Sequence, residues 1–490
     1  MDIKTLFATQ KDQNKLIAEL KAHRNTDEPD TGDYKAQLDP LKHEVYNRVT
    51  RPDKRVKVDP ADPNASDGTT HVTSGGNEEA SYRMEPVARI ALALQKLIVK
   101  RAVSFLFGNA VTLDSVPEGD GEKTVLKALN KVMYDVKAKS FNRKIARMLF
   151  QGTEVAEVWY PVARNHKIYG FDSKFKLKCG ILSPMLGDTL YPYFDENGDM
   201  VAFSRSYSIT KSNVSINYFE TYTDDLQFLW VQGSQGYELV EGYPKTNIVG
   251  KIPVIYGNQE QVEWADVQNL IERLEKLLSN FADTNDYHAA PKIFVKGHIT
   301  GFSKKGESGA IIEGDEGSEA DYLSWDNAPE SVKLEIETLL RMIYTLTQTP
   351  DISFESVKGI GAISGLALKL LFMDAHLKVA DHQEVFDEYL QRRINVVKAF
   401  IGKFNTRLEA DAENLMVEPV IKPYMIVDEA AEMKIWSDAN GGNAVMSQKA
   451  SFTKAGMTSD PDADFEQYQA EQDSLTQRQN SFVLNEPTPA

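Results

Sequence analysis

The eight histidines of this sequence are the side chains best suited to metal binding or acid–base catalysis. They are His23, His43, His71, His166, His288, His298, His376 and His382. None belongs to a His-Glu-x-x-His pair, which binds zinc from one helical face. His376 and His382 are six residues apart, which places them on different faces of a helix. The sequence therefore predicts no metal site and no cofactor.

Motifs for nucleophilic or phosphate chemistry are also missing from the sequence. There is no Gly-x-Ser-x-Gly elbow and no P-loop. Gly359, Gly361 and Gly365 are spaced like part of a dinucleotide-binding loop, but no strand of a βαβ unit precedes them. Acidic clusters such as Glu313, Asp315 and Glu316 keep one enzymatic alternative open. This alternative is a metal-dependent nuclease, which needs carboxylates converging from separate elements. We otherwise expect no enzyme.

Composition indicates a protein that does not bind nucleic acid through a general positive charge. The 490 residues include 72 Asp and Glu against 55 Lys and Arg, which gives a net charge of -17. Such a charge opposes non-specific binding to phosphates, although an acidic channel could let DNA pass. The single cysteine, Cys179, excludes an intrachain disulfide. No apolar run reaches the length of a membrane span. We expect a soluble cytoplasmic protein of two or three domains.

Apolar spacing predicts a mixture of helices and strands before residue 262. A short helix with Leu16, Ile17 and Leu20 on one face lies within 1–30. A mobile loop or arm is expected over 51–82, which is poor in large apolar residues. We expect a helix over 84–107 and a helix pair over 123–151. Strands dominate from 153 to 255, with a hairpin turn at Asn197-Gly198.

Long helices are expected after residue 262. A helix over 262–290 has an apolar stripe and carries acidic residues on its other faces: Glu263, Asp266, Glu272, Glu275, Asp283 and Asp286. A small β-rich excursion leads to a second helix, which ends before Pro350. After a glycine-rich loop, Ser364 can cap a third helix that continues to about Phe404. A β-like piece at Leu415–Ile421, short helices from Ala430 to Gln472 and a polar tail follow.

Several segments resemble, in the same order, a known family of phage proteins. They are Gln95–Thr112, Leu182-Ser-Pro184, Tyr193–Gly198, Gly250-Lys-Ile-Pro-Val-Ile255, Asp283 with Asn285 and Asp286, Ile363-Ser-Gly-Leu-Ala-Leu-Lys369, Ser447-Gln-Lys-Ala450 and Asp460-Pro-Asp462. Together they resemble the portal proteins of tailed double-stranded DNA bacteriophages, in particular the Bacillus siphophage type. The likeness spans most of residues 85–470. One position departs from the family, since Ala110 stands where a proline is usual.

The resemblance implies an α+β fold with the parts of a portal. Its parts are an N-terminal arm and flexible loop (1–83), an α/β wing (84–261), a two-helix stem (262–290 and 330–349), a small α/β clip (291–329), a tunnel loop (351–363), a long kinked channel helix (364–405), an α-helical crown (406–472) and a polar tail (473–490). Portal proteins of this family form rings, usually of twelve subunits, at one capsid vertex. The resemblance therefore implies a head-to-tail connector through which the genome is packaged and ejected.

The same resemblance suggests which residues meet DNA and partners. The tunnel loop would present Ser353, Phe354, Glu355, Lys358, Gly359 and Gly361 to DNA, with Ser364 and Gly365 at its junction with the helix. Lys358 is the first candidate for a transient phosphate contact, and the glycines allow large backbone excursions. Partner contacts of the clip are assigned to Lys296, Lys304 and Lys305.

The partners that the resemblance implies are other copies of the chain, double-stranded DNA in transit, the large terminase, scaffold and major capsid protein, and a head-completion or adaptor protein. No membrane partner is expected. The protein is placed in the virion, and in the host cytoplasm during assembly. A ring-forming scaffold of another injection apparatus stays open as an alternative, because it would share the helices without needing a DNA-sized channel.

Overall fold

The computed structural model describes most of the chain, and its residues group into two compact units. The described residues are 3–24, 27–57, 82–288, 293–296, 299–302, 312–314, 319–322, 328–351, 370, 372–425, 429–440, 446–455 and 461–483. The first unit comprises Met1–Asp351 and Asp374–Tyr424, and the second comprises Ile352–Met373 and Met425–Ala490. Each unit is described separately below.

Two antiparallel sheets form the centre of the first unit. The larger has the order β10-β9-β8-β7-β6, with β11 beside β9: β6 Thr189–Phe194, β7 Met200–Lys211, β8 Val214–Tyr222, β9 Leu226–Gly233, β10 Gly236–Leu239 and β11 Lys245–Thr246. The smaller has the order β12-β4-β5: β4 Glu154–His166, β5 Ser173–Leu182 and β12 Val254–Asn258. Alternating apolar side chains of both sheets, including Val158, Leu190 and Phe203, share one core. The strands expected between 153 and 255 are confirmed.

The hairpin between β6 and β7 turns where the sequence predicts it. Gly198 has a φ of +86°, a conformation that favours glycine. The Asp195 carboxylate accepts hydrogen bonds from the backbone N–H groups of Asn197 and Asp199. Side-chain acceptance of turn N–H groups is the ordinary role of aspartate in such a turn.

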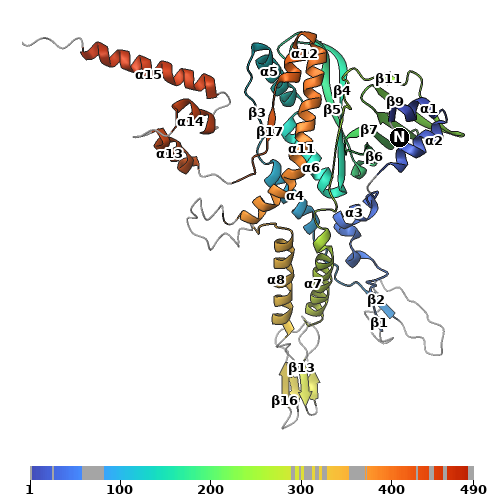
Figure 1. Cartoon of the computed structure of the whole chain (residues 1–490). Coiled ribbons are helices and arrows are strands. Elements are labelled where there is room, and N and C mark those ends of the chain that lie inside the picture. Colours follow the sequence, from blue (N-terminus) through green and yellow to red (C-terminus); the bar gives the residue numbers. More distant parts are fainter. Residues whose placement is uncertain are drawn as a thin grey trace, which may run out of the picture. The chain divides into compact units, whose positions relative to one another are not determined.

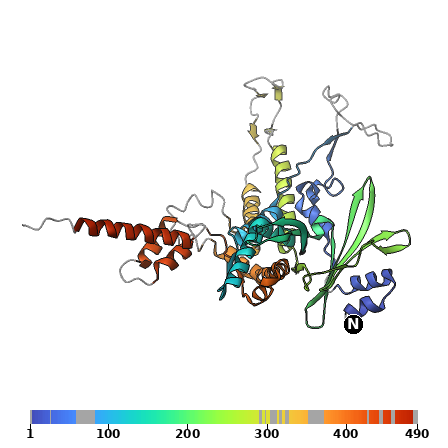
Figure 2. The same ribbon diagram turned by 90° about the horizontal axis from the view of Figure 1, so that it is seen from above.

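Two N-terminal helices pack on the larger sheet. They are α1 (Ile3–Thr9) and α2 (Gln13–Ala22), and Figure 2 shows them against one face of the sheet. The Asp12 side chain caps α2 by accepting from two backbone N–H groups. Leu16, Ile17 and Leu20 are buried against aromatic residues such as Phe219 and Trp230. The expected helix in 1–30 is confirmed, and it belongs to the core of the first unit.

A helical layer covers the smaller sheet. Its members are α4 Leu94–Phe107, α5 Asp120–Asp135, α6 Ala138–Gly152 and α11 Met373–Phe404. The expected pair over 123–151 is confirmed by α5 and α6. In α5 the residues Val125, Ala128, Leu129 and Val132 recur on one face and are fully buried. The start expected for the third long helix, at Ser364, lies outside the described residues.

A short two-stranded ribbon joins distant parts of the first unit. Strand β3 (Thr112–Asp114) pairs with β17 (Glu418–Val420) in antiparallel register. The helix α12 (Glu409–Asn414) also packs in this unit, close to α5. Residues 406–424 belong to the first unit, where β17 pairs with β3, and their assignment to the crown stays a prediction.

Two long helices lie side by side and lead to small β-ribbons (Figure 1). They are α7 (Gln268–His288) and α8 (Ala328–Leu346). Between them in sequence are the ribbon of β13 Ile293–Lys296 with β16 Glu319–Tyr322, and that of β14 Ile299–Phe302 with β15 Ile312–Gly314. The expected helix, β-rich excursion and second helix are confirmed in this order.

The remaining elements of the first unit are short. They are α3 Thr31–Leu38, the pairing strands β1 Lys54–Lys57 and β2 Tyr82–Glu85, and the 3-10 turns η1 Pro40–Lys42, η2 Glu44–Tyr46, η3 Pro184–Leu186, η4 Ala265–Val267 and η5 Thr406–Leu408. Most of the loop expected over 51–82 lies outside the described residues. The pairing of β1 with β2 was not predicted.

Three helices are found among the described residues of the second unit. They are α13 Glu429–Asn440, α14 Gln448–Ala455 and α15 Pro461–Val483. Phe452 of α14 packs against the rings of Phe465 and Tyr468 of α15, with centroids 5.8 and 5.5 Å away. The predicted short helices are confirmed. The polar tail begins later than expected, since α15 continues past residue 473 without a helix-breaking residue.

Candidate functional site

The paired helices α7 and α8 are joined by an apolar seam and one ion pair. Ile271 and Leu274 of α7 and Ile343 of α8 are fully buried. The Arg273 guanidinium donates to the Glu335 carboxylate through Nε at 2.9 Å and Nη2 at 2.7 Å. This pair is half exposed, and a pair of this kind contributes little stability. Apolar burial on both helices thus accompanies the ion pair that joins them.

An extended segment, residues 86–93, runs along α7 and is bound to it through backbone N–H groups. The N–H of Ala88 donates to Asp283 Oδ1 at 2.8 Å, and that of Ile90 donates to Ser279 Oγ at 2.9 Å. Leu92 N–H donates to Glu275 Oε1 at 2.7 Å. Alternate N–H groups of an extended chain thus meet side chains four residues apart on one helical face.

These contacts correct two expectations. The helix expected over 84–107 begins only at Leu94, because the preceding N–H groups bond to α7 instead of to their own backbone. Glu275 and Asp283 were expected on outward acidic faces of α7. They face the extended segment, and Glu275 is only 1% exposed.

N-terminal residues complete the contacts along α7. His43 Nδ1 lies 2.8 Å from Glu275 Oε1, and Arg51 Nη2 lies 2.7 Å from Asp283 Oδ2. Burial lowers the pKa of His43, but the hydrogen bond and charge of Glu275 outweigh it and leave this pKa above its ordinary value of 6.5. The buried carboxylates of α7 are thus neutralised by residues from before the extended segment.

A cluster of polar residues lies among the described residues that flank the predicted tunnel loop and bonds them to one another. We call this cluster the loop anchor. Its members are Arg101, Glu263, Thr347, Lys378 and His382. The Lys378 ammonium lies 2.6 Å from Glu263 and also donates to the Thr347 carbonyl oxygen at 2.9 Å. His382 Nε2 lies 3.2 Å from the other Glu263 oxygen.

Arg101 secures the chain at the end of α8. Its Nη1 donates to the Pro350 carbonyl oxygen at 2.7 Å, and its guanidinium lies 5.5 Å from the centre of the Tyr344 ring. Thr347 and Thr349 are buried, and their hydroxyls bond to each other at 3.0 Å. The loop anchor therefore joins α4, the residues before α7, the end of α8 and the start of α11.

Charge balance keeps Glu263 ionised inside the loop anchor. Burial raises the pKa of Glu263. The hydrogen bond to His382 and the charges of Lys378 and His382 have the larger, opposite effect and bring this pKa down to about 2. The Glu263 side chain is only 6% exposed, and both of its carboxylate oxygens lie close to a positively charged or imidazole nitrogen of α11. The chemistry of this arrangement is that of a structural clamp.

A second buried clamp fixes α11 to the smaller sheet. Arg393 of α11 forms a two-pronged pair with Glu157 of β4, with both N–O distances at 2.7 Å. Glu157 also accepts from the Trp159 indole at 2.8 Å, and Arg393 also donates to Asn142. A planar guanidinium that bonds both carboxylate oxygens fixes orientation as well as distance. The position of α11 is thus set at the loop anchor and again four turns later.

Of the residues predicted to meet DNA or partners, the structure describes only Lys296. It lies in β13 opposite Glu319 of β16, and the two charged groups are 3.7 Å apart and largely exposed. The others lie outside the described residues: Lys304, Lys305, Ser353, Phe354, Glu355, Lys358, Gly359, Gly361, Ser364 and Gly365. Their assignments stay predictions.

Sequence reasoning missed the loop anchor. Lys378 and His382 are four residues apart, which places them on one face of α11, and this spacing was the available signal. Glu263 comes just before α7. Its partners Lys378 and His382 on α11 follow more than a hundred residues later in the sequence. Nothing in the local sequence indicates that pairing.

The described residues also bear on two other possible features, a metal site and a membrane-spanning helix. The described part of the chain contains no group of three or more His, Cys, Asp or Glu side chains positioned to hold a metal ion. Among the described residues, no helix has the length and apolar character needed to cross a membrane.

Comparison with known proteins identifies the family. Residues 83–478 match the family model described as "Phage portal protein, SPP1 Gp6-like". No curated protein sequence matches the chain. Similar solved structures include the neck of a native gene transfer agent particle computed with C12 symmetry, at 10% identity and a TM-score of 0.39 over 74% of this chain and 88% of the other. The neck of an empty particle, computed with C6 symmetry, matches at 10% identity and a TM-score of 0.40 over 74% and 89%.

The family model extends from β2 through the two antiparallel sheets, the helix pair α7 and α8, and α11 into α15. The fold predicted from the resemblance, a mixed helix and sheet architecture of the portal type, agrees with this match. Since residues 83–478 make up most of the 490-residue chain, the protein belongs to the SPP1 Gp6-like family of phage portal proteins.

Proposed function

We propose that this portal protein forms a closed ring of twelve copies at one vertex of a phage capsid, and that double-stranded DNA enters and leaves the head through it. The family match over residues 83–478 is the observation that carries this proposal. A ring of identical subunits needs two different patches that meet head to tail and close. Rigid helices fixed by buried pairs suit such an assembly, because each copy must present the same surfaces.

In this proposal the ring forms the channel for DNA and does not itself power translocation. The large terminase docks on the ring and supplies the energy of translocation. Scaffold and major capsid protein contact the ring during assembly in the host cytoplasm, and a head-completion or adaptor protein binds the clip. The loop 351–363 of each copy faces the DNA, with Lys358 making transient contacts to phosphates. The net charge of -17 supports sliding, because an acidic wall does not hold the phosphate backbone.

The ring can be tested by weighing single particles of the purified protein across a range of salt concentrations. Twelve copies of a 54.9 kDa chain predict a particle of about 660 kDa. Mass alone does not distinguish a portal from a ring-forming scaffold that carries no DNA. A second assay therefore tests DNA packaging. Addition of terminase, procapsids and linear DNA should then protect DNA from nuclease. A protein that stays monomeric at every salt concentration contradicts the proposal.

A further inference from the structure

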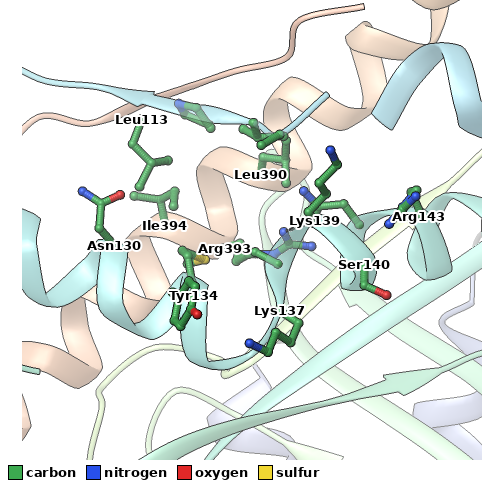
Figure 3. Close-up of a pocket in the computed structure, with 16 residues that line it drawn as sticks. Leu113, Asn130, Tyr134, Lys137, Lys139, Ser140, Arg143, Leu390, Arg393 and Ile394 are labelled. Carbon is green, nitrogen blue, oxygen red and sulfur yellow. Dashed lines mark hydrogen bonds between the residues drawn. The ribbon is translucent and has the colours of Figure 1, made fainter. Parts of the chain in front are cut away.

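A cavity of about 410 Å³ lies between α5, α6, α11 and the β3–β17 ribbon, and it is empty of protein side chains. We call it the basic pocket. Figure 3 shows Leu113, Leu390 and Ile394 on one side of it and the connection between α5 and α6 on the other. Met133 and Val111 also line it, so most of its wall is apolar. The cavity is large enough to receive a side chain of the size of methionine.

The rim of the basic pocket is positively charged. Lys137, Lys139 and Arg143 line it, and all three are exposed (Figure 3). Residues 120–152 carry eight Lys and Arg against three Asp and Glu, in a chain whose net charge is -17. Among the described residues, neither Lys139 nor Arg143 forms an ion pair. The rim therefore offers unpaired positive charge around an apolar cavity.

A surface of the opposite character lies at the far end of the same ribbon. Val116 is 91% exposed and Met416 is 86% exposed, which is unusual for apolar side chains that lie close together. The Ser115 hydroxyl donates to the Met416 carbonyl oxygen at 2.6 Å and so joins the two loops. We call the surface formed by Val116, Met416 and their acidic neighbours the acidic knob.

Exposed carboxylates surround these two apolar residues. They are Asp114, Glu118, Glu413 and Glu418. Glu418 and Asp114 are directly opposite each other in the β3–β17 register. Burial and the nearby charge of Glu418 raise the pKa of Asp387 on α11. The exposed side chains around Val116 and Met416 are therefore rich in negative charge.

The acidic knob is a protruding apolar surface with carboxylates around it, and the basic pocket is an apolar cavity with a cationic rim, so the two are complementary in shape and in charge. We propose that the acidic knob of one copy inserts into the basic pocket of the next copy around the ring. The contact joins two different patches, as a head-to-tail ring requires. Burial of Val116 and Met416 supplies apolar contact, and the carboxylates and the Lys–Arg rim fix the register. The inference rests on the ring put forward under the proposed function and adds the residues that join its subunits.

Charge reversal gives a direct test on the full-length protein. The pocket variant is Lys139→Glu with Arg143→Glu, and the knob variant is Glu413→Lys with Glu418→Lys. Each alone places like charges across every contact and should reduce the ring population by roughly ten-fold. An equal mixture of the two variants makes every contact complementary again, because knobs and pockets of opposite charge alternate. The mixture should restore rings to the wild-type level, as measured by single-particle mass.

Matched controls separate this contact from folding and from the ring itself. Lys167→Glu with Lys174→Glu reverses two exposed lysines of the β4–β5 hairpin and should leave rings intact. Thermal unfolding should show that all variants fold. The inference is overturned if the pocket or knob variant assembles like wild type, or if the mixture fails to restore rings. A wild-type protein that forms no ring instead contradicts the proposed function.

Discussion

Lys378 of α11 bonds to Glu263, 115 positions earlier in the sequence, at an N–O distance of 2.6 Å, and to the last turn of α8 through the Thr347 carbonyl oxygen. One ammonium group thereby connects a residue before α7, the residue that follows α8 and the start of α11. These are the described elements on either side of the predicted tunnel loop. The proposed contact of this loop with DNA would need fixed residues on both sides of the loop, and the bonds of Lys378 join residues on both sides.

Removing the ammonium group should loosen the loop anchor. Lys378→Met leaves Glu263 buried beside His382 alone and leaves the Thr347 carbonyl oxygen without its donor. Loss of one partner of a buried ion pair costs on the order of 3–5 kcal/mol. Chemical denaturation should show a decrease of this size. Lys333→Met is the matched control, because Lys333 pairs with Glu337 while 76% exposed and should change stability by less than about 0.5 kcal/mol.

The depressed pKa of Glu263 predicts how stability depends on pH. Its pKa is about 2 in the folded protein against an ordinary value of 4.5. A group with a lowered folded pKa stabilises the fold above its unfolded pKa and loses that contribution as pH falls through the folded pKa. Glu263 therefore contributes on the order of 3 kcal/mol at neutral pH, and this is lost between about pH 4.5 and pH 2.

The check is a comparison of wild type with Glu263→Gln by denaturant titration at several pH values. The wild type should be the more stable protein at pH 7, and the difference should shrink steadily below pH 4.5. A difference that stays constant from pH 7 to pH 2 shows that the charge of Glu263 is not what stabilises the anchor.

The extended segment on α7 gives a third prediction. Ser279→Ala removes the acceptor of the Ile90 N–H in a fully buried position. An unsatisfied buried donor costs about 1–3 kcal/mol, and hydrogen exchange at Ile90 should become faster. Thr284→Ala, which removes a hydroxyl bonded within its own helix, serves as the comparison. Unchanged exchange at Ile90 in Ser279→Ala indicates that the segment is held by other contacts.

Local patterns in the sequence predicted the helices, strands and turns better than the contacts between elements that are distant in sequence. The apolar stripe of α5 and the Asn197-Gly198 turn depend on neighbouring residues, so they could be identified from spacing. Residues 86–93 look helical by composition, and only the side chains of α7 draw them into an extended form. The pairing of β17 could not be predicted for the same reason, because its partner strand β3 lies about three hundred residues earlier.

In the candidate site, too, local features could be predicted from the sequence and long-range pairs could not. The helices α7 and α8 could be predicted from their apolar spacing, and the glycine-rich loop after them stays a prediction that rests on the resemblance to a family. The loop anchor and the clamp of Arg393 with Glu157 could not be predicted, since each pairs residues that are distant in sequence and that look solvent-exposed in isolation.

Lys358 provides a fourth prediction, which concerns DNA. Lys358→Glu replaces a cation with an anion in the loop proposed to face the phosphates. We expect less DNA packaged per particle, because the only proposed phosphate contact of the loop becomes repulsive. The measurement is nuclease-protected DNA per filled head, with Lys358→Arg as the charge-preserving control. Wild-type packaging by Lys358→Glu removes this residue from the DNA contacts.

The central claim is that the chain closes into a ring whose loops 351–363 surround the DNA path. Electron cryomicroscopy of the purified assembly, reconstructed without imposed symmetry, tests it most directly. We expect a closed ring of twelve copies, with α7 and α8 beside a central channel and the chain after Pro350 entering that channel. Open filaments, or a closed ring in which the chain after Pro350 leads to the outer surface, would contradict it.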